Sequence, residues 1–201
     1  EDFQVHFMRL FCSAFNSIYD LALAWLEPTG DALKKACRAL LNKNACTSRE
    51  EAVQFLSLWI MAFCEKGVAL EHSLNNSSLT KVRRSTANSS FSRNNFNLPK
   101  QFASIMEWDS ETIREVENIL WRNFMKADKN GNYSIALSSV SPRFDEHHVW
   151  WRCKFCSGIT PFGLRGSCPH CGRPNALEEA DLKSLNFWRE PVISAASAVV
   201  V

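Results

Sequence analysis

Two pairs of cysteines, each spaced as Cys-x-x-Cys, stand eleven residues apart in the last third of the chain. The first pair is Cys153 and Cys156, and the second is Cys168 and Cys171. Each pair can close a tight turn that aims two sulfurs at one point, and two such turns supply four thiolates for tetrahedral Zn²⁺. A redox dithiol would need only one pair beside a βαβ pattern, which the sequence lacks. The spacing therefore predicts a structural zinc site.

Four cysteine ligands would close the coordination shell, whereas catalytic zinc keeps one position open. His147, His148 and His170 lie nearby in the sequence, so three cysteines with one of these histidines form the alternative ligand set. The chain has no phosphate-binding loop, nucleophile elbow, HExxH motif or dinucleotide fingerprint. We therefore expect a protein that is not an enzyme and has no small-molecule substrate.

The stretch from 150 to 175 reads WWRCKFCSGITPFGLRGSCPHCGRPN. It resembles a zinc ribbon and is similar to the Ran-binding-protein type of zinc finger. Members of such families bind single-stranded RNA, ubiquitin or protein partners, so the resemblance implies a binding module with an open choice of ligand. It covers about 25 of the 201 residues, and we recognise no family in the rest of the chain.

Basic and aromatic side chains surround the four cysteines. They could stack bases and hold phosphates of RNA or DNA, or they could contact a protein partner. Alternatively, the aromatic side chains form the small core of the module and its contact with the helices. The candidate contact residues are Trp150, Arg152, Lys154, Phe162, Arg165 and Arg173. We expect a scaffold subunit that docks other protein subunits through the zinc module, with nucleic-acid binding as the alternative.

The composition is that of a globular chain, with 46% hydrophobic residues and a net charge of only +2. The longest apolar stretch, from Val5 to Leu26, is interrupted by polar residues and is not expected to span a membrane. Because the chain starts without methionine, we expect it to be a piece of a longer polypeptide. The other cysteines are predicted to be free buried thiols, which fits an intracellular, cytoplasmic or nuclear protein. They are Cys12, Cys37, Cys46 and Cys64.

Apolar spacing predicts three N-terminal helices. The first covers residues 3 to 26, the second follows Asp31, and the third starts at a capping box made by Ser48 and Glu51. The expected fold class is mostly α: a helical bundle, or the end of an α-solenoid, followed by a small four-cysteine zinc ribbon.

Residues 73 to 100 are rich in asparagine and serine, contain no acidic residue, and are predicted to form a basic linker or loop. Ser85 and Thr86 follow two arginines there and are candidate phosphorylation sites. A further helix after Asp109 and a strand from Tyr133 to Val140 are expected next. The predicted division is a helical domain at 1–72, the linker at 73–100, a helix and strand packed on that domain at 101–148, and a zinc ribbon with a C-terminal helix at 149–190.

Overall fold

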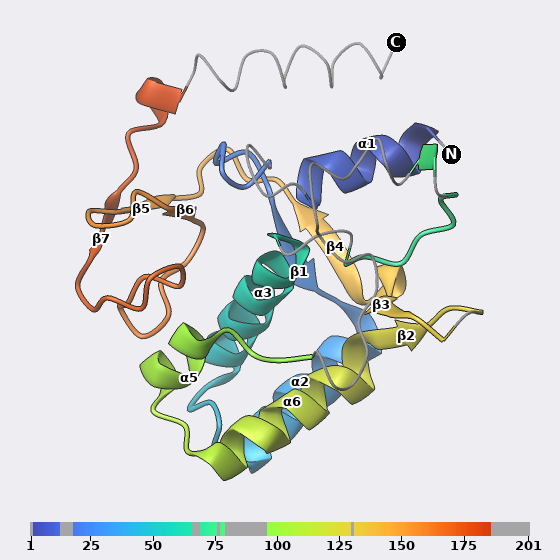
Figure 1. The fold of residues 1–201 in the computed structure, drawn as a ribbon. Helices are drawn as coiled ribbons and strands as arrows, with labels where there is room; N and C mark the ends of the chain where they lie inside the picture. The colour runs from blue at the N-terminus through green and yellow to red at the C-terminus, as the bar shows by residue number, and fades with distance from the viewer. Residues whose placement is uncertain are drawn as a thin grey trace.

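The computed structural model describes residues 2–12, 18–65, 69–75, 77–78, 96–129 and 131–185, and its elements are shown in Figure 1. The helices are α1 (Asp2–Phe11), α2 (Gly30–Asn42), α3 (Arg49–Glu65), α5 (Lys100–Met106) and α6 (Ser110–Phe124). The strands are β1 (Trp25–Pro28), β2 (Met125–Ala127), β3 (Tyr133–Ile135), β4 (Val140–Arg143), β5 (Trp151–Cys153), β6 (Ile159–Thr160) and β7 (Leu177–Glu179). Short 3₁₀ helices cover Leu137–Ser139 and Leu182–Leu185.

The prediction of a mostly α-helical bundle, or of the end of an α-solenoid, was wrong. Within the described ranges, the helices are combined with three small antiparallel sheets. Two of them have two strands each, β1 with β4 and β2 with β3, and the third has the order β6-β5-β7. The protein is therefore a mixed α and β structure.

The error began in the segment predicted as one helix from residue 3 to 26. The structure ends α1 at Phe11, places Ala22 at a positive φ of 53°, and extends Trp25 to Pro28 as strand β1. Most side chains from Ile18 to Leu26 are buried. In a short run that is buried on every side, apolar residues occupy both helical and strand spacings, so periodicity could not separate the two structures.

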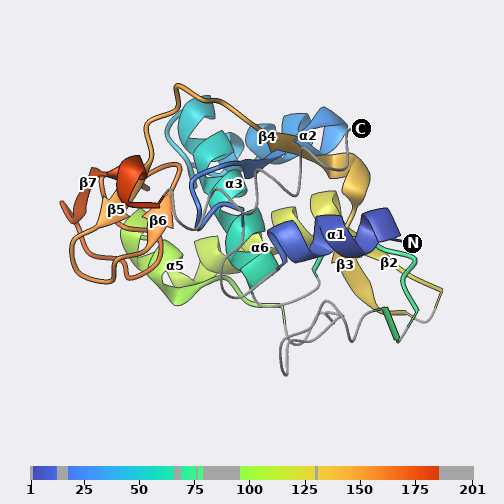
Figure 2. The same cartoon turned by 90° about the horizontal axis from the view of Figure 1, so that it is seen from above.

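Helix α3 lies at the centre of the fold, with α1, α2 and β1 packed against it (Figures 1 and 2). Its residues from Phe55 to Met61 are all buried. At the C-terminal half of α3, Trp59 contacts the rings of Phe63, Phe96 and Phe124 at centroid distances of 5.4, 6.1 and 5.5 Å. These aromatic side chains pack together in the core around α3.

The predicted second and third helices and the helix after Asp109 are confirmed as α2, α3 and α6. Ser48 Oγ accepts a hydrogen bond from the Glu51 amide at 3.1 Å, and Asp109 accepts one from the Thr112 amide at 2.7 Å. Both contacts satisfy amides in the first turn, which have no partner within their helix. The predicted strand from 133 to 140 is divided into β3, a 3₁₀ turn and the start of β4.

Most of the predicted linker at 73–100, with Ser85 and Thr86, lies outside the described residues. At its end, Phe96 and Leu98 are buried in the core before α5 begins. The short helix predicted directly after the cysteines, with Leu177, Leu182 and Leu185, is wrong up to residue 185, where the chain forms β7 and a 3₁₀ turn. Residues 186–190 of the predicted ribbon and helix lie outside the described part. None of the described helices has the length and apolar composition of a membrane span.

Candidate metal centre

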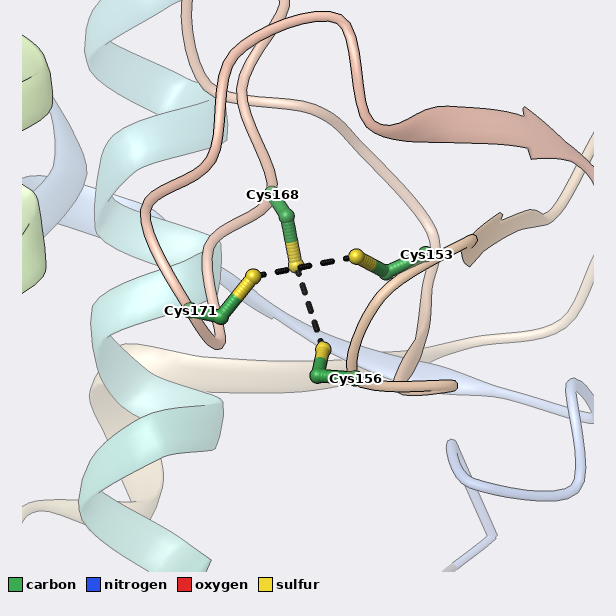
Figure 3. Close-up of side chains that lie close together, drawn as sticks. All are labelled: Cys153, Cys156, Cys168 and Cys171. Atoms are coloured by element: carbon green, nitrogen blue, oxygen red, sulfur yellow. Dashed lines mark hydrogen bonds between the residues drawn. The ribbon is translucent and has the colours of Figure 1, made fainter.

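The four cysteine sulfurs converge on one point (Figure 3) and all lie within 4.8 Å of one another. The Sγ atoms of Cys153 and Cys171 are 3.7 Å apart, and so are those of Cys156 and Cys168. Four sulfurs at about 2.3 Å from a tetrahedral zinc ion are separated by about 3.8 Å. A disulfide would instead bring two sulfurs to about 2.05 Å. The cluster therefore has the donor atoms and the spacing of a tetrathiolate zinc site, as the sequence predicted.

Each cysteine pair is held by a turn with the same two backbone hydrogen bonds. In the first turn the amide of Cys153 donates to the carbonyl of Gly158 at 3.0 Å, and the amide of Ser157 donates to the carbonyl of Cys153 at 2.9 Å. The second turn repeats both bonds at the same offsets from Cys168, at 3.0 and 2.8 Å. The two turns are thus two copies of one structure and present their sulfurs in the same way.

The fourth residue after the leading cysteine adopts a left-handed backbone in both turns. It is Ser157 with φ of 59° in the first turn and Gly172 with φ of 77° in the second. Glycine takes this conformation without strain, whereas serine does not. At Gly172, an added Cβ would also lie 3.3 Å from the Cβ of Gln101.

Substitutions at these two positions should therefore have opposite effects on stability. We expect Ser157→Gly to stabilise the zinc-bound protein by up to about 1 kcal/mol and Gly172→Ala to destabilise it by about 1 kcal/mol or more. Chemical denaturation of the two zinc-loaded variants beside the wild type would measure both changes. If Ser157→Gly destabilised the protein instead, the left-handed backbone at residue 157 would not be a source of strain in the wild type.

Backbone amides stabilise the thiolate form of the leading cysteines. Burial raises the pKa of Cys153, but the amides of Cys156 and Phe155 donate to its sulfur, and the pKa falls to about 6. The pKa of Cys168 is raised, because burial and the neighbouring sulfurs of Cys153 and Cys156 outweigh the two amides of its own turn that donate to its sulfur. Because ligand thiols must lose their protons, zinc binding releases protons and weakens as the pH falls.

The nearby histidines have other contacts. His170 Nε2 lies 3.0 Å from the carbonyl oxygen of Ile159, and its Nδ1 lies 4.0 Å from a carboxylate oxygen of Glu65. His148 Nε2 lies 2.9 Å from the carbonyl of Pro161. In the described part of the chain, the group of possible metal ligands contains only the four cysteines. This arrangement favours four cysteines over the alternative of three cysteines and one histidine.

Two of the predicted contact residues, Trp150 and Phe162, lie where the zinc module packs on the rest of the protein. We call residues 150–180 the zinc module. Only 2% of Trp150 is exposed. The rings of Trp150, Phe162 and His148 lie at 5.8, 5.7 and 4.3 Å from the ring of Trp25 on β1. We call these four side chains the aromatic junction, and they attach the module to the sheet that β1 forms with β4.

Polar contacts fix the other side of the module to α3 and α5. The guanidinium of Arg165, a third predicted contact residue, pairs with Glu51 at 2.6 Å and donates to the carbonyl of Met106 at 3.0 Å. The side-chain amide of Gln101 donates to the carbonyl of Pro169 at 3.2 Å. The charge of Arg165 is therefore paired with Glu51 where α3 and α5 meet the module, although Arg165 itself remains exposed.

The other three predicted contact residues are also exposed: Arg152, Lys154 and Arg173. Arg152 stands opposite Glu178 in the register of β5 and β7. The guanidinium carbon of Arg173 lies 4.3 Å from the ring centroid of Phe155, a cation–π contact. We call Lys154, Phe155 and Arg173 the Phe155 platform. Phe155 is 60% exposed. It belongs to the aromatic side chains around the cysteines but was not among the predicted contact residues, because the sequence pattern alone cannot show which of these rings are exposed.

The chain matches no protein-family model, and no solved structure matches it. It is similar to Druantia protein DruE of Escherichia coli (strain UMEA 4076-1), with 23% identity over 198 residues. The alignment covers 94% of this chain, so it includes both the helices and the zinc module. The same alignment covers 11% of DruE, and the chain thus corresponds to a small part of the length of that protein.

Proposed function

We propose that this chain is a non-catalytic docking domain of a larger protein assembly, and that its four cysteines bind a structural zinc ion. The observation that carries the proposal is the cluster of four sulfurs within 4.8 Å. Four thiolates fill a tetrahedral shell and leave no position for a substrate or a reactive water. The metal then contributes to folding and to the shape of the surface rather than to a reaction.

The way the module is attached supports this role. The aromatic junction and the pair of Arg165 with Glu51 hold the zinc module against β1, α3 and α5. A module held in this way presents its outer surface in a fixed orientation, as a docking surface requires. The alignment with DruE, which covers nearly all of this chain but 11% of that protein, supports a role as one part of a larger protein.

The charges of the module favour a protein partner over nucleic acid. Four of the predicted contact residues are basic. Of these, Arg165 is paired with Glu51, and Arg152 stands opposite Glu178 in the neighbouring strand. The two others, Lys154 and Arg173, balance the formal charge of −2 on a zinc ion with four thiolates. Phosphate backbones are bound by an excess of positive charge, which this surface lacks. The exposed ring of Phe155 beside Arg173 fits the aromatic and arginine side chains that are enriched in protein interfaces.

The test uses Phe155→Ala, with Phe144→Ala as the matched control because Phe144 is also strongly exposed, at 68%, but lies outside the module. We expect tagged wild type and the control to capture the same partner protein from native cells, and Phe155→Ala to capture at least about tenfold less. Fluorescence anisotropy with single-stranded and duplex oligonucleotides at two salt concentrations should show no binding that depends on Phe155. Salt-sensitive oligonucleotide binding that Phe155→Ala abolishes would instead establish the nucleic-acid alternative.

A further inference from the structure

A cavity of about 80 Å³ lies where the zinc module meets α3 and α5 (Figure 2). On the helix side it is lined by Met61 and Glu65 of α3 and by Phe102 of α5. On the module side it is lined by Pro169 and His170 of the second cysteine turn. Since a single water needs about 10–15 Å³ of such space, the cavity has room for several waters or for the end of a long side chain.

Glu65 places a carboxylate in this cavity. Its side chain is 34% exposed, and none of the described residues that line the cavity is a lysine or an arginine. Burial and the nearby carboxylate of Asp20 raise the pKa of Glu65, although His170 opposes this effect. A cation in the cavity therefore stabilises this carboxylate more than it would stabilise one in water.

His170 supplies a second hydrogen-bond acceptor beside Glu65. Its Nε2 lies 3.0 Å from the carbonyl oxygen of Ile159, so the hydrogen of the neutral ring is on Nε2, and Nδ1 is left as an acceptor. This Nδ1 and a carboxylate oxygen of Glu65 lie 4.0 Å apart. Neither acceptor can donate to the other, whereas a ligand that carries several N–H groups can donate to both. The planar guanidinium of arginine has its N–H groups in such a fixed fork.

The remaining lining suits the flat, weakly hydrated guanidinium and the apolar stem that carries it. The side chains of Met61 and Phe102 offer apolar surface from the helices, and Pro161 and Pro169 offer it from the module. A guanidinium packs on such surfaces with its faces while its edges donate hydrogen bonds.

The polar side chains of the lining are held in place by the protein itself. The side-chain amide of Gln101 donates to the carbonyl of Pro169 at 3.2 Å. The ring of His170 packs directly on the backbone of Gly158, where an added Cβ would lie 2.7 Å from it. Because these contacts fix the walls in advance, little entropy is lost when the cavity is filled.

We propose that this cavity receives the guanidinium of an arginine side chain of the partner protein, with Glu65 as its anionic partner and His170 as the second acceptor. The inference rests on the proposed docking role, and it adds a site distinct from the Phe155 platform. Glu65 and His170 are both partly exposed, so a side chain can enter from the surface while its backbone stays outside. Because the zinc module forms one side of the cavity, the arginine can bind only while the module is folded around its metal.

The experiment follows the methionine methyl groups of the zinc-loaded chain by NMR during titration with N-acetylarginine methylamide. Of the four methionines, only Met61 lines the cavity, and Met8, Met106 and Met125 serve as internal controls. We expect a saturable shift of the Met61 methyl signal with a Kd of about 1 mM, and no shift of the other three signals. The citrulline analogue, which has the same shape without the charge, should bind at least about fivefold more weakly.

Three variants separate the cavity from the other sites. Glu65→Gln should weaken binding of the arginine probe at least about tenfold and should capture less partner protein from native cells, because the carboxylate is lost. Phe155→Ala should bind the probe as the wild type does. Cys168→Ser should not bind the probe, because the module side of the cavity unfolds.

An unshifted Met61 signal at about 10 mM probe would overturn the proposal, and so would equal binding of the arginine and citrulline probes. Both results come from the wild type, so they decide the proposal even if a variant fails to fold. Unchanged partner capture by Glu65→Gln would also overturn it. A wild type that captures its partner while Met61 stays unshifted rejects the cavity alone. A shifted Met61 signal in a protein that captures no partner supports the arginine site and rejects the docking role.

Discussion

Replacing Cys168 by serine is expected to remove zinc from the protein and to unfold the zinc module. Cys168 is fully buried, and around the two cysteine turns the buried apolar residues are Cys153, Cys168 and Ala176, with Leu177 against them. Other side chains of the module, such as Trp150 and Leu164, pack into the main core. So little apolar surface cannot offset the entropy lost on ordering the two turns. Metal ligation supplies the missing free energy, which is about 10–16 kcal/mol in small zinc peptides. The variant should therefore bind no zinc.

The helices should largely survive this change. The core around Trp59 contains residues of α3 and α6 and does not include the cysteine turns. Elemental analysis, circular dichroism and limited proteolysis of Cys168→Ser would show absent zinc, retained helical signal and new cleavage within the module. Cys37→Ser, on the buried face of α2, is the matched control and should keep its zinc. Full zinc content in Cys168→Ser, or a complete loss of helix, would contradict the expectation.

Truncating Trp25 to alanine should destabilise the whole protein by about 3–5 kcal/mol, the range for a large aromatic side chain removed from a core. Trp25 is buried, and its ring contacts three side chains of the aromatic junction. Its indole nitrogen also donates to Glu27 at 3.0 Å, and that bond is lost with the ring. The remaining cavity would lie between β1 and the zinc module.

Urea denaturation followed by both tryptophan fluorescence and circular dichroism would measure this change. In the wild type, fluorescence and circular dichroism should report the same urea midpoint. In Trp25→Ala, the zinc module should unfold at a lower urea concentration than the helices, so the fluorescence midpoint should fall below the midpoint of the helical circular dichroism signal. Phe144→Ala removes an exposed aromatic ring and should change the stability by no more than about 0.5 kcal/mol. If Trp25→Ala lowered the free energy of unfolding by less than about 1 kcal/mol, the aromatic junction would contribute little to stability.

Features set by neighbouring residues could be predicted from the sequence. The clustering of the four cysteines was predicted because two Cys-x-x-Cys turns are local structures that aim their sulfurs without help from the rest of the fold. Helices α2 and α6 were predicted because each has a polar face and an apolar face, and the cap at Asp109 is made within one turn. Such features need no long-range contact.

Features set by distant residues could not be predicted. Strand β1 forms because Trp25 to Pro28 pair with Val140 to Arg143, a partner segment that no local pattern identifies. In the same way, Trp150 is buried by Trp25, and Arg165 is neutralised by Glu51. The basic and aromatic pattern around the cysteines therefore could not show which of these side chains pack on the rest of the protein and which stay at the surface.

The most direct test of the account is zinc K-edge X-ray absorption on the purified protein, together with its metal content. The account predicts one zinc ion per chain, surrounded by four sulfur atoms at about 2.3 Å. It attributes those sulfurs to Cys153, Cys156, Cys168 and Cys171, which converge in the structure. A nitrogen or oxygen atom in the first coordination shell, or a protein purified without zinc, would contradict it.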